Sequence, residues 1–522
     1  MPTKEQLSRM WETEFEFPFT RREDDPGYST KVEAIKDMES KTNTFKAIFT
    51  TLPYSNSLPH IGHCFEFVMA DIITRYWRRK SKEGYIFFNT GVDEHGIKIQ
   101  QAAKSLKLSP KEFCDQKAKE WEEFCKLFQI DYDNFYRTSN KIHKKLAKDY
   151  FDFIKNDLEL KQYSGLYCVG CESFKTEKEI KDNKCIIHQQ ELEFITEENY
   201  FLNLSKYAVQ VKDILVDKTL SKELEEIKQT FKEISITRKN IDWSVKIDEE
   251  NSLYVWAEAL MNYYFSYFVK EGKDYELFYG CLYSESLWLD YWRNSVIICG
   301  KDNLKFQAFI LQVLMKLKGI PQNKEILVHG TILDKDGVKM SKSLGNVIDP
   351  MEQAKKYGVS PLRYYLFFGL NTFSDSKYSE QDLINIWNSE VCNNFGNLIS
   401  RTLHLIDIRD VKLDQTLIDE VVINTINAKI DEIDSYFENY QFQRARQVIQ
   451  EILTSLNKLI NDKKPWEESS TDYESILRDI YFYLKILKNY FSIIIPEYSE
   501  KLEKAFKERK KVVLFTPLVK SE

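Results

Sequence analysis

The sequence is poor in the residues that make extended linkers or disulfide-stapled folds. It contains only 17 glycines, 12 prolines and nine cysteines in 522 residues. Three of the cysteines gather in one short cluster, which indicates a reducing compartment and a metal rather than a disulfide framework. Hydrophobic residues make up 43% and aromatic residues 14% of the chain, which excludes a disordered or fibrous protein. At about 100–200 residues per domain, the length predicts roughly three or four domains.

Long apolar runs are also missing. The richest run, Tyr364 to Leu370, has the length of a core segment, whereas a membrane helix needs about 18 or more apolar residues. The N-terminal residues 1–42 mix acids and bases and contain no apolar signal region, and a transit peptide would be poor in acids. We therefore expect a soluble, cytoplasmic protein that has no membrane partner.

The chain has no excess of positive charge. It carries 74 basic and 81 acidic residues, a net charge of −7, so no general basic field would attract nucleic acid. Any nucleic-acid site must therefore be a local surface. The GxxxxGK[ST] loop is absent, and no GxGxxG follows the first predicted strand, so the usual devices for binding phosphate are missing.

The pattern of apolar residues divides the chain into blocks. Buried strands are predicted at 45–52, 85–89, 295–299 and 325–328, and a helical pattern follows the first of them at 62–80. Strands that alternate with helices favour a parallel α/β sheet. Residues 161–243 interrupt this pattern with short polar turns and a charged helical stretch, and almost everything after Leu383 is predicted to be helical. The fold class is therefore an α/β parallel sheet with an inserted domain and a C-terminal helical region.

The first motif with chemical meaning is His60-Ile61-Gly62-His63, directly after a Pro-rich turn. Two imidazoles three residues apart lie on one face of the first helical turn. Gly62 lets a ligand approach the backbone, and the helix N-terminus offers amide donors to a phosphate. Taken alone, such a pair is more often an ordinary His pair at a turn, and a metal pair is a second alternative.

The second motif is Lys339-Met340-Ser341-Lys342-Ser343, which follows a hairpin predicted at Asp336-Gly337. It places two ammonium groups and two hydroxyls on a loop, with Gly345 as a possible hinge. Such groups can follow phosphoryl charge as it develops. Alone, this loop could equally be a solvated basic turn.

The cysteine cluster has the spacing of a metal site. A Cys-x-x-Cys pair and a Cys-x-x-His pair are separated by the 13 residues 172–184, and the four ligands are Cys168, Cys171, Cys185 and His188. Three thiolates and one imidazole form a closed tetrahedral set, so we expect one structural Zn²⁺. The alternative is a group of buried cysteines without a metal.

The two loop motifs together, HIGH at 60–63 and KMSKS at 339–343, resemble those of the class I aminoacyl-tRNA synthetases. Only the 275 residues 64–338 separate them, too few for the editing insertion of the leucine, isoleucine and valine enzymes. The chain has no cysteine just before HIGH, where the cysteine enzyme carries a zinc ligand. Its remaining signatures are similar to those of the methionine–tRNA ligases, namely Gly91 to Gly96, Tyr254 to Trp256, Gly300 to Asp302, and Pro465-Trp466.

This resemblance implies the domain organisation. Residues 1–44 would be an N-terminal extension, and a Rossmann-like catalytic domain would be split into 45–160 and 244–330. The intervening residues 161–243 would be a connective insertion that carries the zinc knuckle, a form that some methionine enzymes have. Residues 331–390 would form a stem-contact region with the KMSKS loop, and 391–522 a helical anticodon-binding domain. Because no appended dimerisation domain is present, we expect a monomer.

The resemblance also implies the reaction and its residues. Methionine would be activated by ATP and Mg²⁺ to methionyl-adenylate and then transferred to the 3′-terminal ribose of methionine tRNA. The catalytic residues would be His60, His63, Lys339 and Lys342, and Gly62, Gly300 and Asp302 would join them in binding ATP. Asp93 would hold the ammonium of methionine. The methionine slot would be completed by Leu52, Tyr54, Trp256, Ala259, Leu260, Tyr263, Asp302, Phe306 and Gln307.

The aromatic and apolar members of this slot also fit a plain buried helix stripe, because Trp256, Ala259, Leu260 and Tyr263 have helical spacing. Two positions depart from the family pattern. Leu260 replaces a proline or an equivalent apolar residue, a mild change, and Gln307 stands where histidine is usual. We expect Gln307 to leave a smaller and less rigid wall beside the slot.

The C-terminal helices carry a candidate anticodon surface. Asn393, Asn397 and Arg401 lie four residues apart on one predicted helix face, and Trp466 after Pro465 offers a plane on which a base can stack. In the family these positions read the CAU anticodon. Two alternatives remain open at this point, namely another class I synthetase and a catalytically inactive tRNA-binding protein on the same fold.

Overall fold

The computed structural model describes residues 46–56, 58–81, 86–168, 173–175, 177–186, 191–207, 213–266, 285–340, 344–414, 418–467 and 472–519. The expectations for residues 1–44, Cys171, His188 and Lys342 therefore lie outside the described residues. None of the helices in the described ranges combines the length and the apolar character needed to cross a membrane.

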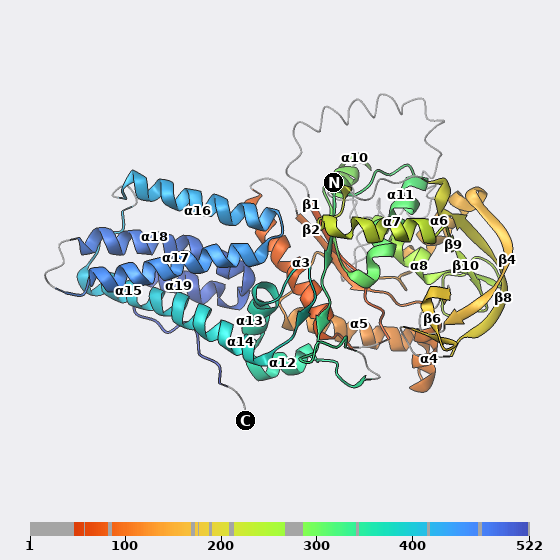
Figure 1. Cartoon of the computed structure of the whole chain (residues 1–522), viewed down its shortest axis with the longest axis horizontal. Coiled ribbons are helices and arrows are strands. Elements are labelled where there is room, and N and C mark those ends of the chain that lie inside the picture. Colours follow the sequence, from red (N-terminus) through yellow and green to blue (C-terminus); the bar gives the residue numbers. More distant parts are fainter. Residues whose placement is uncertain are drawn as a thin grey trace, which may run out of the picture.

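A five-stranded, fully parallel sheet forms the centre of the molecule (Figure 1). Its spatial order is β13 (Glu325–His329), β12 (Val296–Gly300), β1 (Lys46–Thr50), β2 (Ile86–Val92) and β3 (Asn134–Arg137). The direction in which successive strands are added reverses between β1 and β12, which makes this position the topological switch point. In such sheets ligands bind beyond the carboxyl ends of the strands at this point. The parallel sheet expected from the sequence is confirmed.

Both faces of the sheet are buried, which explains why its strands are apolar runs without polar alternation. On β1 the Ile48 side chain belongs to one core cluster, whereas Ala47 and Phe49 belong to the other. The first cluster also contains buried side chains of α3 (Ile61–Lys80), α5 (Pro110–Leu127) and the C-terminal helices. The second contains α6 (Lys141–Ile154), α11 (Leu311–Leu317) and the short helices that follow Tyr254.

An antiparallel sheet lies between β3 and β12 in the sequence, mostly within residues 161–243, where the apolar pattern changes, although that pattern did not predict these strands. Its strands have the order β5 (Ser173–Phe174), β4 (Leu158–Cys168), β8 (Glu193–Asn203) and β9 (Glu233–Ser235). Two smaller pairs accompany it, β6 (Ile180–Lys181) with β7 (Lys184–Cys185), and β10 (Thr237–Lys239) with β11 (Asn251–Leu253). The charged helix α7 (Ser221–Thr230) lies between β8 and β9 in the sequence, and β4 and β8 form the outer edge of the molecule in Figure 1.

Beyond β13 a short parallel pair, β14 (Ile332–Leu333) and β15 (Ser376–Lys377), leads into the helical part of the chain. Between this pair and the bundle lie the short helices α12 (Pro350–Tyr357), α13 (Val359–Tyr364) and α14 (Glu380–Ile386), whereas α4 (Ile97–Ser105) follows β2 and α10 (Glu285–Arg293) precedes β12. The bundle consists of α15 (Asn397–Arg409), α16 (Glu420–Glu438), α17 (Phe442–Lys463), α18 (Tyr473–Ile494) and α19 (Ser499–Glu508) (Figure 1). The predicted helical C-terminal region is thereby confirmed.

A fully buried arginine fastens this bundle to the sheet domain. Arg363 donates from Nη2 to Asp71 Oδ2 of α3 (2.6 Å), from Nη1 to the Phe128 carbonyl (2.7 Å) and from Nε to the Ile494 carbonyl at the end of α18 (2.8 Å). Arg363 and Asp71 are both 0% exposed. Helix α3 begins at the HIGH motif and binds Arg363 through Asp71, so this helix connects the edge of the sheet to the bundle.

Candidate active site

The HIGH motif caps the helix that follows β1. His60 is the N-cap of α3, and its Nδ1 accepts the backbone N–H of Gly62 (3.1 Å) and of His63 (3.3 Å). In return His63 Nδ1 accepts the N–H of His60 at 3.3 Å, and the two rings stack with centroids 3.6 Å apart. Since both Nδ1 atoms accept N–H bonds, the neutral rings carry their protons on Nε2. The imidazoles therefore share one face of the first turn, as the spacing predicts.

Gly62 is required by this stacking. A Cβ atom at position 62 would lie 3.0 Å from Cε1 of His60, closer than side-chain atoms normally approach. Glycine therefore lets the His60 ring fold back over the first turn of α3, where the positive end of the helix dipole favours an anion.

The KMSKS loop reaches the same sheet edge from β14. Leu333 pairs with Lys339 across a turn in which the Asp334 N–H donates to the Val338 carbonyl and Gly337 has φ +83°, so the predicted hairpin is present. Lys339 Nζ lies 2.6 Å from Oδ2 of Asp302, which follows β12. Both side chains are exposed, Lys339 at 58% and Asp302 at 76%, so the ion pair is open to a ligand. Ser341, Lys342 and Ser343 lie outside the described residues.

The carboxyl end of β2 carries the next predicted residue. Asp93 is 4% exposed, and Thr138 Oγ1 donates to its Oδ1 at 3.2 Å. The Asp93 backbone pairs with Tyr54 in a short parallel bridge, and the Tyr54 hydroxyl donates to the His95 carbonyl at 2.5 Å. The segments after β1 and β2 are thus held together, which brings Asp93 and Tyr54 to one place as the sequence predicts.

Aromatic rings from the segments after β11 and β12 form the next part of the candidate site, its aromatic wall. The Trp256 and Phe306 rings stack with centroids 4.1 Å apart and an interplanar angle of 11°. Tyr263 is buried, donates its hydroxyl toward the Thr50 carbonyl (3.4 Å) and contacts Phe49 edge to face. Burial raises the pKa of Tyr263 well above its ordinary value, so its hydroxyl stays protonated. Ala259 and Leu260 are buried, and Leu52 is half-buried against the same core cluster.

The segment that carries Trp256 differs from the single helix expected. It consists of α8 (Val255–Glu258), a 3₁₀ turn over Ala259–Met261 and α9 (Asn262–Phe265). The Ala259 carbonyl accepts both the backbone N–H and the side-chain amide of Asn262, the latter at 2.6 Å, which closes a tighter turn than an α-helix allows.

Gln307 lies in this wall on a π-helical turn, Phe306–Ile310, and is 4% exposed. Its carbonyl oxygen Oε1 is buried and has no hydrogen-bond partner within the described ranges. A histidine at this position would carry no such buried amide oxygen. The effect of Gln307 on the shape of the slot stays a prediction.

Sequence reasoning missed two buried networks at this edge of the sheet. In the first, Glu66 of α3 accepts bonds from the Thr51 N–H (2.7 Å) and hydroxyl (2.6 Å), and lies 3.2 Å from His329 Nε2. In the second, Glu258 binds His95 and His143. The one available signal was an acidic residue within the apolar segment after Trp256, since the partners of Glu258 are 163 and 115 residues away.

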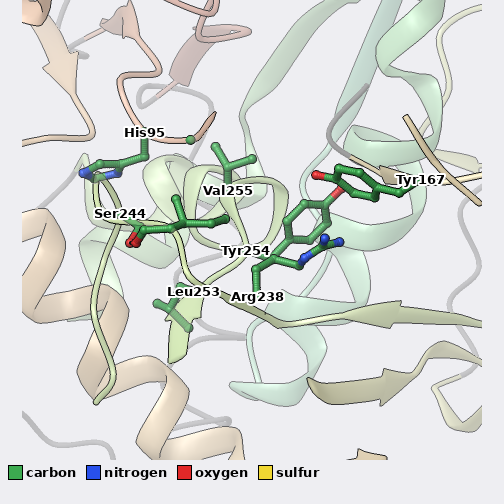
Figure 2. Close-up of a pocket in the computed structure, with 9 residues that line it drawn as sticks. His95, Tyr167, Arg238, Ser244, Leu253, Tyr254 and Val255 are labelled. Carbon is green, nitrogen blue, oxygen red and sulfur yellow. The ribbon is translucent and has the colours of Figure 1, made fainter. Parts of the chain in front are cut away.

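A small cavity adjoins the second network, where the inserted sheet meets α8 (Figure 2). Its volume is about 10 Å³, and His95, Arg238, Ser244 and Tyr254 are among its lining residues. The Arg238 guanidinium lies over the ring of Tyr167 at 4.4 Å and near that of Tyr254 at 5.9 Å. Arg238 thus connects Tyr167 of the inserted sheet to Tyr254, which is two residues before Trp256.

Two of the four predicted zinc ligands can be placed. Cys168 ends β4, Cys185 ends β7, and both are buried in one small cluster with Leu192. Cys171 and His188 lie outside the described residues, and within the described ranges no group of three or more metal-ligating side chains is found. The strand ends therefore bring one cysteine from each predicted pair into the same cluster, and the zinc site stays a prediction.

The bundle brings together part of the predicted C-terminal surface. Asn393 and Asn397 are exposed, although Asn393 lies in a π-helical stretch, Trp387–Gly396, that precedes α15. The guanidinium of Arg401 lies 5.6 Å from the ring centroid of Trp466, which is 42% exposed, while Pro465 is buried beneath. A cation and an aromatic plane therefore meet at the surface, an arrangement that suits stacking with a base.

Comparisons with known proteins agree with these features. The sequence matches the family described as "tRNA synthetases class I (M)" over residues 46–182 and 175–403. The chain is thus a class I tRNA synthetase.

Among its relatives, the methionine–tRNA ligase of Mycoplasmopsis pulmonis is 34% identical over 488 residues, which covers 88% of this chain and 93% of the relative. That of Ureaplasma parvum serovar 3 is 33% identical over 485 residues, with 88% and 91% covered. The solved structure of Mycobacterium tuberculosis methionyl-tRNA synthetase in complex with methionyl-adenylate has a TM-score of 0.79 at 25% identity, covering 88% of this chain and 93% of that chain. The chain belongs to the methionine–tRNA ligase family and is an aminoacyl-tRNA ligase.

Proposed function

We propose that this enzyme activates L-methionine with ATP and transfers the methionyl group to the 3′-terminal ribose of a tRNA with a CAU anticodon. The observation that carries the proposal is the convergence at one sheet edge. His60 and His63 follow β1, and Asp93 follows β2. Asp302, which pairs with Lys339, follows β12. These three strands are neighbours in the sheet, and the switch point lies between β1 and β12.

In the first step the carboxylate oxygen of methionine attacks the α-phosphorus of ATP. A new P–O bond forms, the bond to the β-phosphate oxygen breaks, and pyrophosphate leaves with the bonding pair. The Nε2–H groups of His60 and His63 and the positive end of the α3 dipole would stabilise the charge on the phosphates. Lys339, held by Asp302, and Lys342 of the same loop would follow that charge as it develops. Gly62, in the first turn of α3, and Gly300, at the end of β12, complete the proposed ATP site.

The methionine slot is supported by the positions of its walls. We propose that Asp93 pairs with the ammonium in a nearly dry site, where a charge-assisted hydrogen bond is strong. The Trp256–Phe306 stack and Tyr54 would enclose the thioether, with Leu52, Ala259, Leu260, Tyr263 and Gln307 behind them. Because a thioether accepts only weak hydrogen bonds, shape would supply most of the selectivity.

Two metals belong to this proposal. Mg²⁺ would enter with ATP, since it prefers phosphate oxygens and water as ligands. One Zn²⁺ would be held by Cys168, Cys171, Cys185 and His188. Its support is that thiolates suit Zn²⁺ and that Cys168 and Cys185 share one buried cluster. When bound, this metal would tie the ends of β4 and β7 together.

In the second step the ribose hydroxyl of the tRNA attacks the acyl carbon of the adenylate, and AMP leaves. We propose that Asn393, Asn397, Arg401, Pro465 and Trp466 read the anticodon, because the two asparagines are exposed and Arg401 lies against Trp466.

Charging of transcribed tRNA by the purified full-length protein tests the whole proposal. The methionine tRNA should accept methionine. The same transcript with its CAU anticodon replaced should be charged far more slowly, while methionine-dependent adenylate formation without tRNA is unaffected. Equal charging of both transcripts would contradict the proposed anticodon reading, and charging of neither with methionine would contradict the proposed function.

A further inference from the structure

A buried carboxylate holds two imidazoles beside the proposed methionine slot. Glu258 of α8 is 1% exposed, and its two oxygens bind different rings. His95 Nδ1 donates to Oε1 at 2.7 Å, and His143 Nε2 donates to Oε2. Burial by itself would raise the pKa of Glu258, but the two imidazoles lower it to about 2, so the carboxylate is ionised at neutral pH.

The two rings come from segments that are otherwise separate. His95 lies in the loop after β2, and His143 is on α6, where its Nδ1 is 2.6 Å from the hydroxyl of the fully buried Tyr136 on β3. Glu258 thus ties together a loop, a helix and, through Tyr136, a strand of the central sheet.

Glu258 and His95 are close in the sequence to two residues of the proposed methionine slot. Glu258 is two residues after Trp256, and His95 is two residues after Asp93. The His95 carbonyl also accepts the Tyr54 hydroxyl. The carboxylate therefore links the segment that carries the proposed ammonium ligand to the segment that carries the aromatic wall.

We propose that Glu258 is a positioning residue that holds Asp93 and Trp256 at the separation which methionine requires. The inference rests on the proposed function, because Asp93 and Trp256 are assigned to the methionine slot there. Glu258 acts through His95 and touches no reacting atom.

The other nitrogen of His95 supports this role. Nε2 is buried and has no hydrogen-bond partner within the described ranges, so the bond to Glu258 is the ring's one hydrogen bond there. Glu258→Gln keeps the size of the side chain but removes its charge, and an amide can accept from only one of the two donor rings. The other ring then keeps its bond only by changing tautomer, and both bonds lose the negative charge of the acceptor. The loop that carries Asp93 keeps the bond from Tyr54 to the His95 carbonyl, but its connection to α8 is weakened.

The test uses the full-length protein in methionine-dependent ATP–pyrophosphate exchange. In Glu258→Gln the KM for methionine should rise about tenfold or more, because small misplacements of binding groups are costly. The KM for ATP should stay unchanged, since the residues proposed to bind its phosphates, His60 and Lys339, follow β1 and β14 and not the segments that Glu258 joins. Glu258→Asp keeps the charge but is one methylene shorter, so its methionine KM should fall between those of the wild type and Glu258→Gln.

A matched control and a second variant remove the remaining ambiguities. Glu250→Gln makes the same chemical change at a side chain that is 73% exposed and paired with Lys239, and it should leave both KM values unchanged. If Glu258 acts through His95, the double variant Glu258→Gln/His95→Asn should have the methionine KM of Glu258→Gln alone. Active-site titration by the adenylate burst corrects every value for unfolded protein.

The outcomes separate this inference from the proposed function. Wild-type protein without methionine-dependent exchange would overturn the proposed function. If the wild type is active, two results for Glu258→Gln would overturn only the positioning role. One is an unchanged KM for methionine, and the other is an equal increase in the KM for methionine and for ATP. A lower burst with both KM values unchanged would show that Glu258 serves folding alone.

Discussion

His60 has two separable tasks, since its ring caps α3 and is proposed to bind phosphate. His60→Ala removes the acceptor of the Gly62 and His63 N–H groups. Loss of an N-cap costs about 0.5–2 kcal/mol of unfolding free energy. His60→Asn should restore most of this stability, because asparagine is among the best N-cap residues and the backbone at position 60 is extended, with φ −116° and ψ 172°.

The activity of the two variants should not differ in the same way. Both lack the imidazole Nε2–H that is proposed to meet the developing phosphate charge, and removal of one such donor costs about 10²–10³ in turnover. Thermal unfolding and ATP–pyrophosphate exchange, measured on the same preparations, separate the two effects. We expect stability in the order wild type, then His60→Asn close behind, then His60→Ala, with both variants equally slow.

Two results would refute this reasoning. If His60→Asn turned over like the wild type, the ring would be a helix cap and no more. If His60→Ala were as stable as the wild type, the hydrogen bonds from Gly62 and His63 would not support the helix.

Four further outcomes are expected. Arg363→Lys keeps the charge but leaves up to two buried backbone carbonyls without their hydrogen bond. The free energy of unfolding should fall by about 1–3 kcal/mol for each carbonyl. An unchanged unfolding curve in denaturant would contradict this. Trp466→Ala should weaken tRNA binding by about 1–3 kcal/mol while leaving adenylate formation intact, and a titration with labelled tRNA that shows equal affinity would count against base stacking. Gln307→His should change the KM for methionine in pyrophosphate exchange and the affinity, measured by calorimetry, of inhibitors that fill the space beside the slot. If neither value changes, Gln307 does not shape the slot. Metal analysis should find one zinc per chain in the wild type and none in Cys185→Ser, whereas equal zinc in both would exclude this ligand.

Local patterns in the sequence were enough to predict several of the elements that carry the candidate site residues. Helix α3 begins within the HIGH motif at Ile61, one residue before the predicted start, because proline, a turn and a capping residue precede it. The hairpin before Lys339 follows from Asp336-Gly337, since Gly337 supplies the positive φ that the turn requires. The apolar runs predicted the parallel strands. The observed strand order places the residues after β1, β2 and β12 at one edge of the sheet.

Interactions between distant segments could not be predicted in this way. The bond between Glu258 and His95 joins residues 163 positions apart, and neither residue belongs to a local pattern that names the other. The 3₁₀ turn at Ala259–Met261 depends on one side-chain bond from Asn262 that competes with the helical pattern. The bridge from Arg363 to Asp71 likewise needs the bundle to be packed on α3 before the two side chains meet.

The most direct measurement is ATP–pyrophosphate exchange by the purified full-length protein with each of the twenty amino acids in turn. The account predicts that methionine supports exchange and that every other amino acid supports far less. Exchange that is fastest with a different amino acid would assign the slot formed by Asp93 and Trp256 to another substrate. No exchange with any amino acid would contradict the claim that the groups at this sheet edge form an adenylate.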